Sequence, residues 1–147
     1  MAFIIHVSAL VEDDGRFLFV REGKEKNYGK LNLPGGHLNE GEELQDGVRR
    51  EVREETGLEV AIEDLVGLYT GLGEPHYLHL VFTARVEGGQ LMPQQGEIIE
   101  CQWLWADELF ERGEEEILNP NKLRVILQDY HAGARTPLAL IRENIRG

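Results

Sequence analysis

The segment that decides the fold spans residues 35–58 and reads GGHLNEGEELQDGVRREVREETGL. Its second half lacks proline, and apolar residues recur there at the i, i+4 and i+8 spacing of one helix face: Leu44, Val48 and Val52. Gly57 follows this stretch, and glycine commonly ends a helix because it adopts the left-handed conformation without strain. We therefore expect a helix over 43–56, preceded by a break at Gly35-Gly36.

Three glutamates of this segment, Glu51, Glu54 and Glu55, fall within an arc of about 100° on the expected helix. Glu51 and Glu55 lie at i, i+4, where like charges destabilise a helix by a few tenths of a kcal/mol. One interpretation is a solvated helix face held by charge pairs such as Arg50 with Glu54. The other is a site for a hard divalent cation, which prefers carboxylate oxygens as ligands. The spacing alone leaves both interpretations open.

The wider pattern favours the second interpretation. Gly36, Glu42 and the run Arg-Glu-Val-Arg-Glu-Glu-Thr-Gly-Leu at 50–58 resemble an unbroken Nudix box over residues 36–58, with every fixed position matched. The strand and the Pro-Gly-Gly before the box fit the layout of the same family. The resemblance implies that residues 1–147 form a single Nudix domain of the α/β class, an α/β/α sandwich around a mixed β-sheet.

The resemblance also implies an activity, the hydrolysis of a phosphoric anhydride in a nucleoside diphosphate linked to another group. Water would attack phosphorus with Mg²⁺ or Mn²⁺ as the cofactor. On the family pattern the metal ligands are Glu51, Glu54, Glu55 and the backbone carbonyl of Gly35. Arg50 and Glu42 match the residues that orient these carboxylates.

A further glutamate is commonly drawn from across the site in this family, as a metal ligand or catalytic group, and Glu97 and Glu100 are the candidates. Strand side chains alternate between faces, so two positions three apart point to opposite sides. We expect Glu97, at a loop-to-strand junction, to be the one that faces the metal. The alternative is that both carboxylates are solvated.

Residues outside the box are expected to recognise the group attached to the diphosphate. His37 is a candidate substrate-binding residue that contacts a phosphate or simply holds its own loop, and Tyr28 either stacks on a base or packs in its loop. We expect His76 and His79 to be an exposed pair at the start of a strand. His6 is interpreted as a histidine satisfied within a strand.

Two subfamily signals point in different directions. The segment 119–138 and the Gly-His-Leu at 36–38 resemble a bacterial phosphatase branch of the family. That branch implies removal of single phosphates from nucleoside tri- and diphosphates or from thiamine-type pyrophosphates. Pro75 and Tyr77 approximate marks of ADP-ribose and dinucleoside polyphosphate pyrophosphatases, which are the alternative. A third possibility is a module that binds a nucleotide without cleaving it.

The rest of the chain predicts the elements around the box. Apolar residues 2–10 and 17–20 flank a turn at 12–15 and predict a β-hairpin. We expect strands at 31–33, 59–69, 77–86 and 98–104, and helices at 107–112 and 121–132. Asn119 or Asn121 is expected to cap the last helix, and Trp103 and Trp105 are expected to share one side of the last strand.

Composition narrows the classes of partner. The chain has 147 residues and a formal net charge of −12, which repels duplex nucleic acid and favours a small-molecule nucleotide substrate. No apolar run approaches the ~20 residues that span a bilayer, and no basic segment precedes a hydrophobic stretch at the N-terminus. We therefore expect no membrane partner and a cytoplasmic location. Cys101, the single cysteine, is expected to be a structural thiol.

Overall fold

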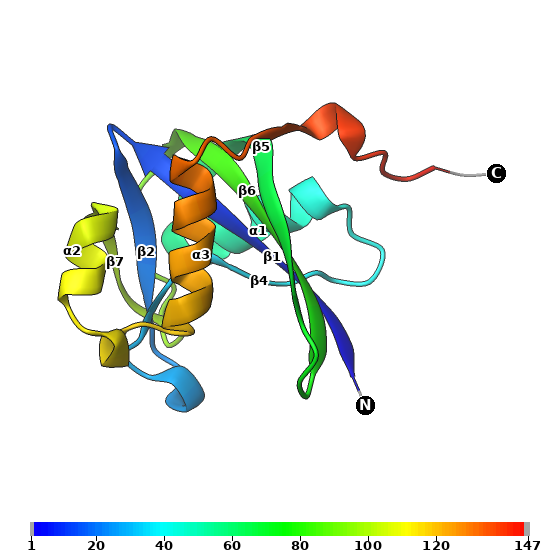
Figure 1. The fold of residues 1–147 in the computed structure, drawn as a ribbon. Helices are drawn as coiled ribbons and strands as arrows, with labels where there is room; N and C mark the ends of the chain where they lie inside the picture. The colour runs from blue at the N-terminus through cyan, green and yellow to red at the C-terminus, as the bar shows by residue number, and fades with distance from the viewer. Residues whose placement is uncertain (1, 146–147) are drawn as a thin grey trace.

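The N-terminal hairpin is confirmed in the computed structural model, which describes residues 2–145 (Figure 1). Strands β1 (Phe3–Asp13) and β2 (Arg16–Glu22) pair antiparallel. Both turn residues have positive φ, 53° at Asp14 and 85° at Gly15, as the two central residues of a type I′ turn require. The Asp-Gly pair therefore sets the register from which the sheet is built.

The other expected elements are present with bounds that differ by at most three residues. The strands after β2 are β3 (Leu31–Asn32), β4 (Gly35–His37), β5 (Leu58–Gly71), β6 (His76–Gly89), β7 (Ile98–Leu104) and β8 (Thr136–Pro137), of which β4 and β8 were not predicted. The helices are α1 (Leu44–Thr56), α2 (Ala106–Glu111) and α3 (Pro120–His131), with 3₁₀ turns η1 (Glu25–Asn27), η2 (Glu114–Glu116) and η3 (Leu138–Leu140).

The sheet is mixed, as expected. Its strands follow the order β3-β2-β1-β6-β5-β8, while β4 pairs with β1 and β7 pairs with β2. β1 and β6 run parallel, with Phe3 opposite His76 and Val11 opposite Ala84, and the other pairings are antiparallel. The parallel pair brings residues near position 6 beside residues near position 79.

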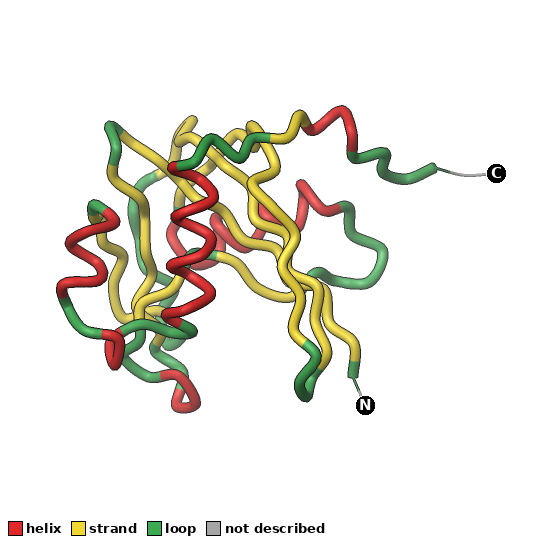
Figure 2. The backbone as a smooth tube through the Cα atoms, viewed as in Figure 1, coloured by secondary structure: helices red, strands yellow, loops and turns green. Residues whose placement is uncertain are grey.

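Helices cover both faces of the sheet (Figures 1 and 2). On one face the buried residues Val48 and Val52 of α1 pack in a cluster with Val7 of β1. On the other face Leu123 of α3 packs in a second cluster with Leu10 of β1. This arrangement is the expected α/β/α sandwich.

The alternation along β1 decides which side chains face α3. Val7 belongs to the α1 cluster and Leu10 to the α3 cluster. Because successive strand residues point to opposite faces, His6 and Ser8 lie on the same side as Leu10. This parity places two polar side chains beneath the start of α3.

The expected break at Gly35-Gly36 was wrong. These residues form β4, which pairs antiparallel with β1, with Ser8 opposite Gly35 and His6 opposite His37. The two backbones are so close that a Cβ at Gly35 would lie 2.3 Å from both the Val7 carbonyl oxygen and Ser8 Oγ. Glycine here permits a close strand pairing rather than a turn.

Two local predictions at element ends also need correction. Asn119 is the N-cap of α3, but it has a left-handed backbone (φ 49°, ψ 61°) and its side chain makes no capping hydrogen bond. Pro120 begins the helix, and the fixed φ of proline suits that position. Strand β7 ends at Leu104, so Trp105 does not share a strand face with Trp103 but precedes α2, about half exposed.

The C-terminal segment returns to the body of the fold. β8 pairs with β5, and the carboxylate of Glu143 accepts a hydrogen bond from the backbone N–H of Leu44, the first residue of α1. The helix has no side-chain cap from its own N-cap residue, Glu43. Within residues 2–145 we find no helix with the length and apolar character needed to span a membrane.

Candidate active site

Arg50, on α1, connects three parts of the box. Its Nε donates to Glu42 Oε2 at 2.7 Å, its Nη1 to Glu51 Oε1 at 2.9 Å, and its Nη2 to the carbonyl oxygen of His37 at 3.1 Å. The hydrogen bonds to Glu42 and Glu51 raise the pKa of Arg50 above its usual range, and Glu42 contributes most. The guanidinium is therefore a fixed positive charge that joins the loop before α1 to the helix.

Glu51 is held against the backbone of β4. Its side chain is only 14% exposed, and a Cβ added at Gly36 would lie 2.7 Å from Glu51 Oε1. Burial raises the pKa of Glu51, while Arg50 opposes that shift. Any larger residue at position 36 would displace this carboxylate, which explains why the motif requires glycine there.

Glu55 is the most buried carboxylate of the site. The backbone N–H of Gly35 donates to Glu55 Oε1 at 2.9 Å. Burial raises the pKa of Glu55 to about 8, and the carboxylates of Glu22 and Glu51 raise it further against the Gly35 hydrogen bond. A cation bound beside this carboxylate would oppose that shift.

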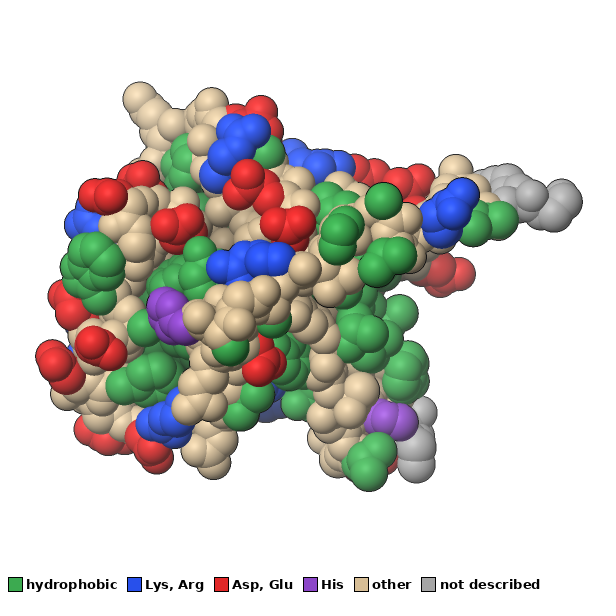
Figure 3. Space-filling model, turned by 45° about the horizontal axis from the view of Figure 1, so that its top comes forward, with side chains coloured by type: hydrophobic (Ala, Val, Ile, Leu, Met, Phe, Trp, Pro, Cys, Tyr) green, Lys and Arg blue, Asp and Glu red, His purple; other side chains and the backbone are tan. Residues whose placement is uncertain are grey.

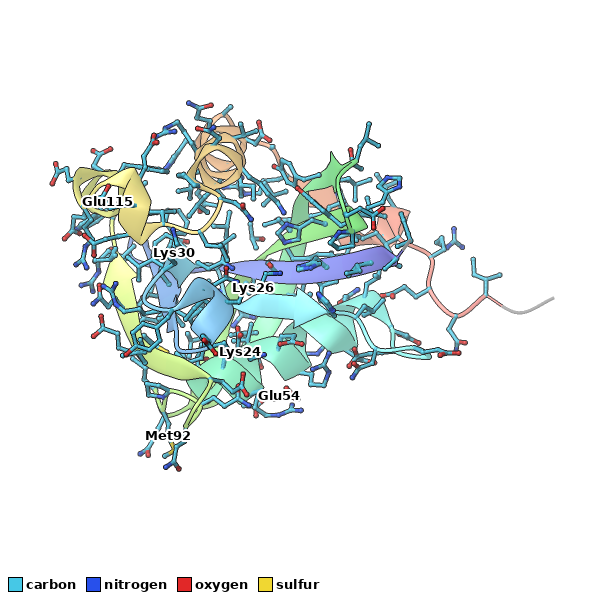
Figure 4. The ribbon with its side chains drawn as sticks, turned by 90° about the horizontal axis from the view of Figure 1, so that it is seen from below. Lys24, Lys26, Lys30, Glu54, Met92 and Glu115 are labelled. Atoms are coloured by element: carbon cyan, nitrogen blue, oxygen red, sulfur yellow. The ribbon has the colours of Figure 1, made fainter. Side chains whose placement is uncertain are left out.

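Glu54 is placed differently from the other two. Its side chain is 43% exposed and meets Arg50 Nη1 at 3.3 Å, but it does not line the cavity described below. Figure 4 shows Glu54 on α1 and Lys24 on the loop just ahead of η1. The structure thus brings Glu51 and Glu55 together but leaves Glu54 on the outer side of the helix.

A cavity of about 450 Å³ opens beside α1 and β4. Its acidic lining residues are Glu22, Glu51, Glu55 and Glu97. Glu97 forms an ion pair with Lys24 at 2.9 Å, between Glu97 Oε2 and Lys24 Nζ. Glu100 instead receives a 2.9 Å bond from Arg21 Nε and does not line the cavity. Of the two candidates from the sequence, the structure therefore places Glu97 at the cavity.

The opposite side of the cavity is basic and polar. It is lined by His6, Ser8, His37, His79, Asn119 and Lys122, with apolar residues of α3 behind them. The expectation that His79 is exposed was wrong: it is 7% exposed and its Nε2 lies 2.8 Å from Ser8 Oγ. The parallel pairing of β6 with β1 buries this residue opposite His6. Burial lowers the pKa of His79 to about 3 and that of His6 to about 4.

The two candidate substrate residues are not brought together. His37 lines the cavity, and its ring centroid lies 4.5 Å from that of His6 in an edge-on contact. Tyr28 is 67% exposed and does not line the cavity. Cys101 lies on β7, where burial raises the pKa of its thiol to about 11, as suits a structural residue rather than a nucleophile.

A family model of the NUDIX domain matches residues 3–128, which include the whole box. The chain belongs to the NUDIX domain family. A solved NUDIX hydrolase from Nitrosomonas europaea superposes with a TM-score of 0.85 at 30% identity, covering 96% of this chain and 97% of that one. The shared architecture extends well beyond the box.

Two curated relatives are similar in sequence to this NUDIX domain, over different shares of its length. A MutT-like protein of Streptomyces ambofaciens is 37% identical over 70% of this chain, and the aligned part spans only 64% of that relative. Phosphatase NudJ of Escherichia coli K12 is 28% identical over 93% of this chain and 89% of its own length. The second match therefore includes the C-terminal helix as well as the box.

The donors of this NUDIX domain suit a hard divalent cation. Across residues 2–145, no group of three His, Cys, Asp or Glu side chains is already arranged to hold a metal ion. Glu22, Glu51 and Glu55 nevertheless line one cavity, and each has a pKa raised by burial and by a neighbouring carboxylate. Partly buried carboxylates that line one cavity supply the oxygen donors that Mg²⁺ or Mn²⁺ prefers.

Glu22 was missed by sequence reasoning. It ends β2 and its polar neighbours give no motif, so nothing in the local pattern separates it from the other surface carboxylates. Lys122 and Asn119 were missed as cavity residues for a similar reason, because they read as an ordinary helix start. Only the packing of α3 over the sheet brings them to the site.

Proposed function

We propose that this NUDIX domain hydrolyses a phosphoric anhydride in a small nucleoside diphosphate-linked molecule, using Mg²⁺ or Mn²⁺. The observation that carries the proposal is that Glu22, Glu51 and Glu55 line one cavity and that Arg50 fixes Glu51. An intact box and a NUDIX hydrolase neighbour of matching length support it.

Different residues of the chain would bind the cation and hold its ligands in position. Glu51 and Glu55 would hold the cation, together with the Gly35 carbonyl and Glu97, and Glu54 remains a candidate ligand from the family pattern. Arg50 and Glu42 keep the helix carboxylates in place, because Arg50 bonds both Glu42 and Glu51. A bound divalent cation supplies positive charge to the phosphate oxygens and activates water.

We also assign Glu97 the role of general base. It lies at the cavity beside Lys24, ahead of β7, and an ionised carboxylate there can accept a proton from the attacking water. His37 lines the same space and can donate a hydrogen bond to a phosphate oxygen. Tyr28 is exposed and lies outside the cavity lining, so it would contact only the far end of a long substrate.

Within this class we favour release of single phosphates from nucleoside tri- and diphosphates. The favouring observation is that the match to phosphatase NudJ runs over 93% of this chain and includes α3. Pyrophosphatase action on ADP-ribose or dinucleoside polyphosphates is the alternative. A module that binds without cleaving is disfavoured, because every catalytic position of the box is intact.

The test is hydrolysis by the purified protein. A panel of nucleoside tri- and diphosphates, ADP-ribose, dinucleoside polyphosphates and thiamine pyrophosphate is incubated with Mg²⁺ or with EDTA, and each product is identified. We expect turnover with Mg²⁺, none with EDTA, and inorganic phosphate as the small product. Tight nucleotide binding without turnover would instead support the binding module.

A further inference from the structure

The cavity wall opposite α1 carries a cation without an anionic partner. Lys122, in the first turn of α3, has no carboxylate or hydrogen-bond partner among residues 2–145, and its Nζ lies 4.2 Å from the centroid of the Tyr77 ring. Burial alone lowers the pKa of Lys122, to about 8. The only other lysine at the cavity, Lys24, is paired with Glu97. In a chain of net charge −12, an unpaired and partly buried ammonium is a site that lacks its anion.

A second polar group on this wall also lacks a partner. His79 is 7% exposed and uses Nε2 for Ser8, but its Nδ1 is buried and makes no hydrogen bond. Buried polar atoms are rarely left unpaired, because the lost hydration is not otherwise repaid. Lys122 and His79 line the same cavity.

The surroundings favour an anion over a neutral or cationic group. Asn119 lines the cavity with a side chain that makes no capping bond, and the first turn of α3 contains no acidic residue. The N-terminus of a 12-residue helix adds partial positive charge at the same place. The cavity carboxylates, Glu22, Glu51, Glu55 and Glu97, come from β2, α1 and the loop before β7 rather than from this wall.

We propose that the Lys122 wall, made of Lys122, His79, His6, Ser8 and Asn119, binds a phosphoryl group at the end of the substrate away from α1. The substrate would then be a diphosphate that carries a second, separate phosphate. This inference rests on the proposed hydrolysis, since it assigns the anhydride to the α1 side. Lys122 Nζ and the side-chain amide of Asn119 offer several donors to the oxygens of a tetrahedral phosphoryl group.

The assignment has a consequence for the substrate alternatives. A thiamine-type pyrophosphate would place a thiazolium cation in the same cavity as Lys122, and like charges at close range are unfavourable. A cavity of about 450 Å³ has room for more than a diphosphate alone. We therefore expect thiamine pyrophosphate to be a poorer substrate than a nucleoside diphosphate that carries a second, separate phosphate.

The first arm of the test measures anion binding without catalysis. Inorganic phosphate is titrated in EDTA into the wild type, Lys122→Gln, Lys122→Arg and the exposed control Lys26→Gln, with calorimetric detection. We expect the phosphate Kd to rise about tenfold in Lys122→Gln, to stay within about threefold in Lys122→Arg, and to be unchanged in Lys26→Gln. Equal Kd values in Lys122→Gln and the wild type would overturn the proposal.

The second arm separates a substrate phosphate from free phosphate. The ratio of kcat/KM is compared for a nucleoside 5′-diphosphate with and without a 3′-phosphate. We expect Lys122→Gln to lower that ratio about tenfold and Lys122→Arg to restore it. An unchanged ratio would overturn the proposal even if phosphate binding weakened, because the wall would then serve free phosphate. Absence of all hydrolysis by the wild type would overturn the proposed function instead, while Lys122-dependent phosphate binding would still support an anion site here.

Discussion

The two walls of the cavity differ in how they are encoded and in their charge. The α1 wall comes largely from one contiguous segment, residues 36–58, and it collects buried carboxylates around Arg50. The Lys122 wall is assembled from β1, β6 and α3, so Ser8 and His79 meet across 71 positions of sequence. Under the proposed function, the contiguous wall would hold the cation and the assembled wall would contact the rest of the substrate. On the face of the molecule that Figure 3 shows, Asp and Glu side chains are scattered among Lys, Arg and hydrophobic side chains.

The largest expected effect is on the α1 wall. Glu55→Gln should lower kcat at least ~100-fold, because it removes a charge that holds the cation in the transition state. Stability should not fall in EDTA, since glutamine keeps an acceptor for the Gly35 N–H and removes a buried ionisable group. The matched variant Glu54→Gln should lose less, because its side chain lies outside the cavity. Steady-state kinetics and thermal unfolding check both, and wild-type turnover in Glu55→Gln would refute the assignment.

The burial of His79 in the Lys122 wall predicts that the free energy of unfolding depends on pH. The folded-state pKa of His79 is lowered from 6.5 to about 3, so the unfolded chain takes up this proton first as the pH falls. The stability contributed by neutral His79 is present above pH ~6.5 and is lost below it, by up to about 2 kcal/mol between pH 7 and 5. Urea unfolding at both pH values should show a smaller loss in His79→Gln. Equal losses in both proteins would contradict the burial of a neutral His79.

Glu97, in the loop before β7, also lines the cavity and is expected to give an intermediate effect. Glu97→Gln should lower kcat about tenfold, because the group lines the cavity. Glu100→Gln is the matched control, since Glu100 bonds Arg21 and lies outside the cavity, and it should keep kcat within about twofold. A large loss in Glu100→Gln alone would reverse the assignment, and no loss in either would favour two solvated carboxylates.

The smallest expected effect concerns the support of α1 from the C-terminal segment. Glu143→Ala removes the acceptor for the Leu44 N–H, which α1 does not replace with a cap of its own. We expect the free energy of unfolding to fall by about 1 kcal/mol, as for the loss of a helix cap. Glu40→Ala, at an exposed position before α1, is the control. If chemical denaturation gave equal losses for both, the capping role would be wrong.

The sequence predicted elements best where the signal is local. The helix over 43–56 was placed to within one residue because its apolar spacing and its terminal glycine lie within one segment. The hairpin was predicted for the same reason, from one Asp-Gly pair. The strand at Gly35-Gly36 was missed because glycine signals a break by itself. Its strand conformation depends on the close approach of β1, which no local pattern reports.

The candidate site shows the same contrast between local sequence signals and contacts between distant segments. The positions of Arg50, Glu51 and Glu55 follow from the box. Strand alternation predicted that only one of Glu97 and Glu100 faces the site, and Glu97 was chosen because it lies at a loop-to-strand junction. His79 was expected to be exposed because its burial depends on the parallel pairing of β6 with β1. Lys122 lies in the segment 119–138 that resembles a phosphatase branch, but nothing there predicted that its side chain lines the cavity, since an amphipathic helix start looks alike whether it covers a core or a cavity.

The central claim is that the α1 wall directs water to phosphorus in a phosphoric anhydride. Hydrolysis of the best substrate in ¹⁸O-labelled water, followed by mass spectrometry of both products, tests it most directly. The account predicts that label appears in one phosphate-containing product, only when Mg²⁺ is present, and is lost with Glu55→Gln. Label in the alcohol or sugar product would mean attack at carbon and would contradict the account.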